Sequence, residues 1–86
     1  MDVNQLIKNV NIKIKKNINC EEVKIVDKTY LHKKHSTHQL GKFHFHITIK
    51  SNDLKKLNKV ESSKKIFKIL DQEMELYIHS LQLNII

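Results

Sequence analysis

The sequence predicts one small α/β (α+β) domain in which a helix, two strands, a second helix and a third strand follow in that order. Apolar residues recur at helical spacing in the two helical segments, whereas they alternate with polar residues in the extended ones. The 86 residues suffice for one hydrophobic core, so we expect residues 1–86 to form a single domain. One glycine and no proline leave few tight-turn residues, which favours long helices and strands over a loop-rich fold.

The first helix is expected to begin after Asp2, whose side chain can cap it, with Gln5 as the reciprocal capping residue. One apolar stripe then follows at helical spacing, formed by Val3, Leu6, Ile7, Val10 and Ile14. Lys15 and Lys16 place cations at the negative end of the helix dipole, so we expect the helix to end there.

The first two strands are predicted on either side of a loop that is rich in histidine. Val23 and Ile25 flank Lys24 in the first strand. Residues 43–50 alternate apolar and polar side chains over their full length, which is a strong signal for a half-buried strand. The loop between the strands contains the only glycine, Gly41, for which we expect a backbone conformation that other residues avoid.

The third strand is expected to follow the longest helix. Residues 51–53 break the second strand, and Leu54 and Leu57 suggest a short helical turn. Asn58 and Glu61 form a second capping pair before the predicted helix. Its apolar face is predicted to comprise Val60, Ile66, Phe67, Ile69, Leu70 and Met74. In the last strand, one face is predicted to carry Tyr77, His79, Leu81, Leu83 and Ile85, and the other Ile78, Ser80, Gln82 and Asn84.

These elements predict a mixed three-stranded sheet with both helices on one face. The second and third strands should run parallel because a helix connects them, whereas the first and second should run antiparallel. The opposite face should be open to water, and we expect His44, His46 and Thr48 to point there.

The histidines form the most distinctive chemical feature. Five of the six fall between His32 and His46, and His79 stands alone in a late apolar segment. Neutral imidazole is the commonest metal ligand in proteins, so His79 and the loop could build a metal site if the fold joins them. The loop histidines have two alternative interpretations. They could be exposed polar residues without a ligand, or they could bind zinc through His32, His35 and His38.

Charge and composition limit the classes of function that we expect for this chain. The formal net charge is +7, but the lysines are spread along the chain, which suits solubility as well as an anionic partner. Cys20 is the only cysteine, and the acids beside it, Glu21 and Glu22, disfavour a reactive thiolate. No catalytic set or phosphate-binding glycine loop is recognisable, so we expect no enzyme. Without a signal sequence or a membrane span we expect a cytoplasmic protein, or an organellar one if a presequence precedes this chain.

Four local sequences resemble the BolA family in order and spacing. They are VDKTYLH at residues 26–32, the pair His44–Phe45, Ser51 after the second strand, and IHSL at residues 78–81. The resemblance implies a topology like that of type II KH domains and a monothiol glutaredoxin as partner. It also implies a [2Fe–2S] cluster shared with glutaredoxin and glutathione, with the isolated chain in the apo form, and a role in iron–sulfur cluster trafficking or iron regulation.

Carried over by position, the ligand in the family's C-terminal motif is His79, and the second ligand comes from the loop, where we favour His35 or His38 over His32. The Arg-His-Arg group of many members is replaced here by Ser62, Ser63 and Lys64. A homodimer is left open.

The alternative function is nucleic-acid binding through a basic second helix, as in a transcription regulator. Its candidate residues are Lys55, Lys56, Lys59, Lys64, Lys65 and Lys68. KH domains clamp the nucleic-acid backbone with a GXXG loop, which a chain with one glycine cannot form. Lysines on a helix usually form a solvated face, so we expect any such binding to be weak.

Overall fold

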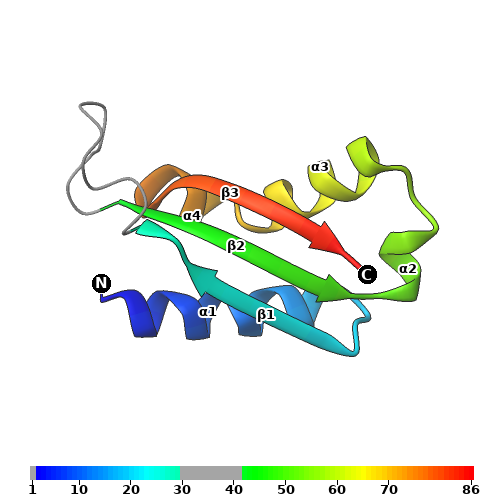
Figure 1. Ribbon diagram of the computed structural model, residues 1–86, viewed down its shortest axis with the longest axis horizontal. Coiled ribbons are helices and arrows are strands. Elements are labelled where there is room, and N and C mark those ends of the chain that lie inside the picture. Colours follow the sequence, from blue (N-terminus) through cyan, green and yellow to red (C-terminus); the bar gives the residue numbers. More distant parts are fainter. Residues whose placement is uncertain (1, 30–41) are drawn as a thin grey trace.

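The computed structural model describes residues 2–29 and 42–86 and contains one three-stranded sheet in this part of the chain (Figure 1). The elements are α1 (Val3–Asn17), β1 (Glu22–Asp27), β2 (Phe43–Lys50), α2 (Asn52–Lys55), α3 (Lys59–Ile69), α4 (Asp71–Leu76) and β3 (Ile78–Ile85). The strand order is β1-β2-β3, with β1 antiparallel and β3 parallel to the central β2. The predicted mixed sheet and its topology are confirmed.

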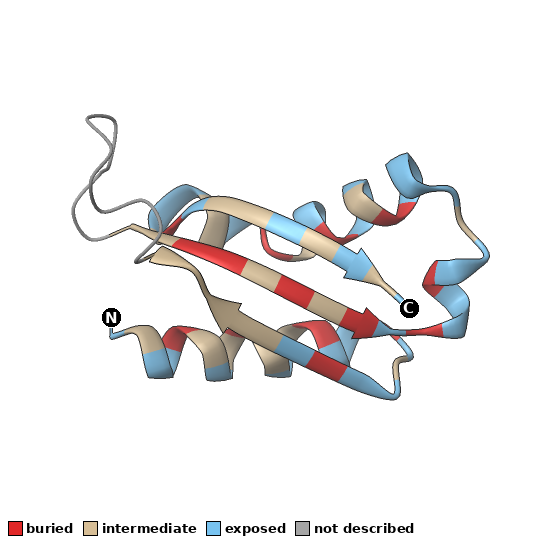
Figure 2. Cartoon of the chain, in the orientation of Figure 1, coloured by how far each residue is buried: buried red, intermediate tan, exposed pale blue. Residues whose placement is uncertain are grey.

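The helices cover one face of the sheet, and the hydrophobic core lies between the two layers (Figure 1). The central strand contributes Phe45, Ile47 and Ile49, which are buried, and Figure 2 shows these buried positions recurring along β2. They pack in one cluster with residues of the helices, chiefly Leu6, Val10, Ile14, Ile66 and Leu70. The opposite face carries polar residues of β2 and β3 and has no helix of the described chain over it.

Helix α1 begins and ends where its sequence predicts. The Asp2 carboxylate accepts a hydrogen bond of 2.8 Å from the Gln5 amide, which satisfies one of the free N–H groups of the first turn. Leu6, Val10 and Ile14 form its buried stripe, and Lys15 lies in its last turn. The amphipathic pattern of this segment therefore decides both its structure and its orientation.

Ser51 connects the end of β2 to two other parts of the fold. Its buried hydroxyl donates to the carbonyl of Asn19 at 2.8 Å and accepts from the Leu54 amide at 3.2 Å. The same side chain thus caps α2 and fixes the segment that leads from α1 into β1. The predicted helical turn at Leu54 is confirmed as α2, with Leu54 buried in the core.

The second long helix differs from its prediction in two ways. It is interrupted at Leu70, so that α3 and α4 replace one continuous helix, and α1 is the longest helix of the described residues. The buried side of α3 comprises Ser62, Ile66 and Leu70, whereas Val60 and Phe67 are 62% and 38% exposed. A hydroxyl is compatible with the buried side because Ser62 Oγ donates to the Lys59 carbonyl at 3.1 Å.

Strand β3 also departs from its predicted alternation. Phe43 pairs with Ile78, but His44 pairs with Ser80, so His79 is an extra residue without a counterpart in β2. The shift, which resembles a β-bulge, places Ile78 in the core although strict alternation assigns it to the open face. It also removes His79 from the face that Leu81 shares with the helices.

Candidate functional site

His79 is exposed at the beginning of β3 because of the register shift. A residue in regular alternation would point either into the core or onto the open face, next to a residue of β2. The extra position frees the imidazole from both constraints. Bulges commonly redirect a side chain beside functional sites, and His79 fits that pattern.

His44 supports His79 from the neighbouring strand. Its ring lies edge to face against the His79 ring, with centroids 5.0 Å apart and an interplanar angle of 65°. Its Nδ1 lies 2.7 Å from the hydroxyl of Ser80, the residue opposite it in β3. His44 is only 5% exposed, so the expectation that it points into solvent is wrong. Because His44 is buried and held by Ser80, we interpret it as a structural support for the His79 ring.

The backbone at His44 is held by the end of the segment that precedes the loop. The Thr29 hydroxyl accepts from the His44 amide at 3.1 Å, and the Lys28 amide donates to the His44 carbonyl at 2.7 Å. Thr29 is oriented by Asp27, whose carboxylate accepts from both its amide, at 2.9 Å, and its hydroxyl. The VDKT sequence therefore supports the pair His44–His79. The role of Thr29 and that of Ser80 are not predicted from the sequence above, although an Asp two residues before a Thr is a common turn signal.

Both ends of the histidine-rich loop lie at this end of the sheet. Thr29 contacts His44 on one side, and on the other the Phe43 amide donates to the Tyr77 carbonyl at 2.9 Å. The loop therefore leaves and rejoins the sheet next to the start of β3. Three of the predicted ligands, His32, His35 and His38, lie outside the described residues. Within residues 2–29 and 42–86, no three metal-binding side chains gather, and His79 is the predicted ligand whose position the structure describes.

Residues 14–86 match the family of BolA-like proteins. The chain belongs to this family. The match spans β1, β2, α2, α3, α4 and β3, and so includes the segment with His79 and Ser80. A comparison with curated proteins gives no match.

Solved structures show the same BolA fold. The BolA domain of SufE1 from Arabidopsis thaliana superposes with a TM-score of 0.77 at 20% identity, covering 99% of this chain and 92% of that one. BolA1 from the same plant gives a TM-score of 0.74 at 23% identity, over 91% and 86% of the two chains. A Bol-like protein from Babesia bovis gives 0.71 at 13% identity, over 92% and 80%.

The bond between Ser80 and His44 predicts a measurable effect on the stability of this BolA-like chain. Replacing Ser80 with Ala should lower the free energy of unfolding by about 1–2 kcal/mol, because the Nδ1 of a buried imidazole loses its hydroxyl partner. Urea unfolding followed by circular dichroism measures the change. Ser80→Thr retains the hydroxyl and should stay closer to the parent protein. Equal stability of Ser80→Ala and the parent would show that this bond contributes nothing.

Cys20 lies between α1 and β1, away from His79, and is half-buried. Burial raises the pKa of its thiol above the usual value, while the Lys15 ammonium acts in the opposite direction. The direction agrees with the sequence analysis, but the main cause is burial and not the acids at Glu21 and Glu22.

Cys20 is therefore expected to react slowly at neutral pH. Only the thiolate is nucleophilic, and a raised pKa means that it forms at higher pH than in an unfolded chain. The rate of alkylation by iodoacetamide is measured against pH by mass spectrometry. The pH at which this rate increases should be higher for the folded protein than for the protein unfolded in urea. Fast alkylation of the folded protein at pH 7 would contradict this.

The lysines of the alternative function are all exposed, but they do not form one surface. Lys64, Lys65 and Lys68 lie on the side of α3 away from the buried Ile66, as expected from helical periodicity. Lys55 and Lys59 line a groove beside β3 instead.

Among residues 2–29 and 42–86, no helix has the length and apolar character that a membrane span requires.

Proposed function

We propose that this BolA-like protein is an adaptor without catalytic activity that pairs with a monothiol glutaredoxin and shares a [2Fe–2S] cluster with it. The observation that carries the proposal is the exposed imidazole of His79, displaced from the strand alternation and braced by the buried His44. Membership of the family gives the proposal its partner. The proposed role is delivery of clusters or sensing of iron.

The chemistry of the donor set fits such a cluster. Histidine replaces cysteine on one iron of Rieske-type [2Fe–2S] centres, where it raises the reduction potential. Here His79 would supply one imidazole, and His32, His35 or His38 of the loop would supply another. Thiolates of glutaredoxin and glutathione would complete the set, since Cys20 lies elsewhere in the fold.

The contacts that hold the His79 ring in place should strengthen its binding to the cluster. A ligand held in position by its neighbours loses less conformational freedom on binding, and such outer partners typically change metal affinity by about 10–100-fold. His44 and Ser80 provide that support through the ring contact and the bond at Nδ1. Because two imidazoles from this chain leave the other positions of the cluster to thiolates of glutaredoxin and glutathione, we expect the cluster only in the complex, a state that suits transfer.

Reconstitution tests the proposal. The chain is mixed with a monothiol glutaredoxin, glutathione, iron and sulfide without oxygen, and size-exclusion chromatography separates the products while visible absorption follows the cluster. A heterocomplex whose spectrum differs from that of the cluster-bearing glutaredoxin alone is the expected result. Elution of all cluster with glutaredoxin alone, at every ratio of the two proteins, would contradict the proposal.

A second candidate function, nucleic-acid binding, is favoured by the exposure of all six lysines in and between α2 and α3. We expect weak, sequence-indifferent binding that depends on salt, because phosphate contacts release counterions. If all six lysines contacted phosphates, log K would fall against log salt with a slope of about −5, and fewer contacts would give a shallower slope. Fluorescence anisotropy with a labelled duplex measures it. Tight, sequence-specific binding at physiological salt would make this the main function.

A further inference from the structure

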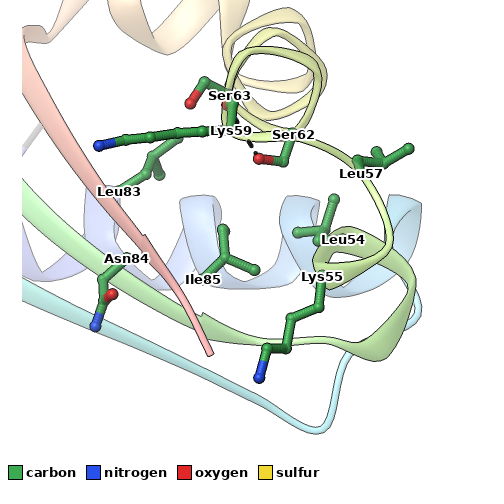
Figure 3. A pocket seen from close by; sticks show the side chains of 9 residues that line it. All are labelled: Leu54, Lys55, Leu57, Lys59, Ser62, Ser63, Leu83, Asn84 and Ile85. Carbon is green, nitrogen blue, oxygen red and sulfur yellow. Dashed lines mark hydrogen bonds between the residues drawn. The ribbon is translucent and has the colours of Figure 1, made fainter.

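A groove of ≈ 380 Å³ lies between α2, the start of α3 and the end of β3 (Figure 3). Its apolar lining comes from Leu54, Leu57, Leu83 and Ile85. A second, more open hollow of ≈ 570 Å³ continues along β3 to Phe67 and Leu81 and shares Leu83 with the first. Together they form one surface, the α3–β3 groove, which follows the edge strand.

The strand at this groove has an unpaired edge within the described chain. β3 is the last strand of the order β1-β2-β3. Its hydrogen bonds to β2 come from even-numbered positions, since the Ile86 amide donates to the Ile49 carbonyl and the Ile86 carbonyl accepts from Ser51. In a parallel ladder the alternate residues point their N–H and C=O groups the other way. Leu81, Leu83 and Ile85 therefore direct these groups to the outer edge.

Positive charge borders the same surface. Lys55 and Lys59 line the first hollow, and neither hollow has an aspartate or glutamate among its described lining residues. The exposed apolar side chain of Phe67 lies on the α3 side. A free strand edge and an apolar floor are features that bind an extended peptide by strand addition, and the flanking ammonium groups favour a peptide with acidic residues.

We propose that the α3–β3 groove binds an extended acidic–apolar peptide segment of a partner protein, which adds to the sheet as a strand beside β3. Backbone groups of Leu81, Leu83 and Ile85 pair with the peptide. Its alternate apolar side chains enter the groove, and its acidic residues meet Lys55 and Lys59. The peptide site begins at Leu81, two residues after His79, and runs along β3 away from the proposed cluster site, so that its far end at Ile85 lies about 20 Å from His79 along an extended chain.

Two other occupants fit less well. A second copy of this chain would bring together two molecules with a formal charge of +7 each, and would add lysines where the groove needs acids. A nucleic acid would supply anions, but single strands bind largely by stacking on aromatic rings, and Phe67 is the one phenylalanine, tyrosine or tryptophan lining the groove in the described chain, with only the imidazole of His46 beside it. The apolar floor and free strand edge favour a peptide.

The test uses a capped ten-residue peptide that alternates valine and glutamate, titrated into the ¹⁵N-labelled full chain. The amide signals of Leu81, Leu83 and Ile85 should shift, and their hydrogen exchange should slow by at least about tenfold as they become hydrogen-bonded. A peptide alternating valine and lysine is the control for charge and should bind at least about tenfold more weakly.

Paired variants separate this site from general attraction of charge. Lys55→Glu with Lys59→Glu should weaken binding by about tenfold, whereas Lys64→Glu with Lys65→Glu on the outer face of α3 should leave it within about twofold. Equal loss in both double variants, or no change at the β3 amides at millimolar peptide, would overturn the proposal. So would tighter binding of a single-stranded oligonucleotide to the same amides, or shifts of these amides on dilution without peptide.

Discussion

The His79→Ala variant is expected to lose the shared cluster. The exposed imidazole at the start of β3 is the ligand proposed for the described part of the chain, and alanine has no atom that can replace it. We expect the cluster held in the heterocomplex to fall by at least about tenfold, as judged by its visible absorption at fixed protein concentration. The fold should persist because the side chain is exposed, so the far-ultraviolet circular dichroism should match that of the parent.

His46→Ala is the matched control for this variant. His46 is also in the sheet at this end, two residues after His44 in β2. It pairs with Gln82, whereas the ring that lies against His79 is that of His44. Its loss should leave the absorption of the complex unchanged. An intact cluster spectrum in His79→Ala, or an equal loss in His46→Ala, would remove His79 from the ligand set.

The Phe45→Ala variant is expected to unfold most of the protein. Phe45 is 1% exposed in the central strand, packs in the core and stacks on Phe43 with ring centroids 6.0 Å apart. Removing a buried phenyl ring costs about 3–5 kcal/mol, which is close to the whole stability of many small domains, about 5 kcal/mol upward. Urea titration followed by circular dichroism at 222 nm should show the midpoint shifted far toward zero.

Phe67→Ala provides the comparison within the same chain. The same atoms are removed, but Phe67 is partly exposed on α3, so we expect a loss below about 1 kcal/mol. The contrast also tests which side of α3 faces the core. If Phe67→Ala destabilised the protein as much as Phe45→Ala, the helix would be rotated relative to the structure described above.

Much of the fold could be predicted because local patterns agree with the final packing. The alternation in residues 43–50 matches β2, and the stripe with Leu6, Val10 and Ile14 matches the buried side of α1. Asp2 and Asn58 each cap a helix with the side chain that their position suggests. In these elements one face is buried, so the period of the apolar residues determines the arrangement.

The departures in the second helical segment and in β3 share a physical cause, which is that long-range packing overrides the local apolar pattern. Val60 and Phe67 continue the helical spacing of the second helical segment but lie exposed, while Ser62 is buried because its hydroxyl bonds to the backbone. In β3, the sequence alternates apolar and polar residues as a regular strand would. The pattern therefore gives no sign of the register shift at His79 that turns Ile78 toward the core. Long-range pairing decides both cases.

The candidate site could be predicted in one residue but not in its support. The histidine pattern and the family resemblance both point to His79, yet the burial of His44 depends on contacts with Thr29 and Ser80 that are 15 and 36 residues away in sequence. No local pattern specifies such contacts. The loop histidines stay predictions, because His32, His35 and His38 lie outside the described residues.

The most direct test of the account is the detection of a nitrogen ligand from this chain on the cluster. The heterocomplex is prepared with ¹⁵N-labelled histidine in the BolA-like chain only, reduced by one electron, and studied by pulsed electron paramagnetic resonance. We predict a hyperfine coupling to nitrogen that changes with the isotope and is diminished in His79→Ala. A spectrum that is insensitive to the label, or identical in His79→Ala, would contradict ligation by this imidazole.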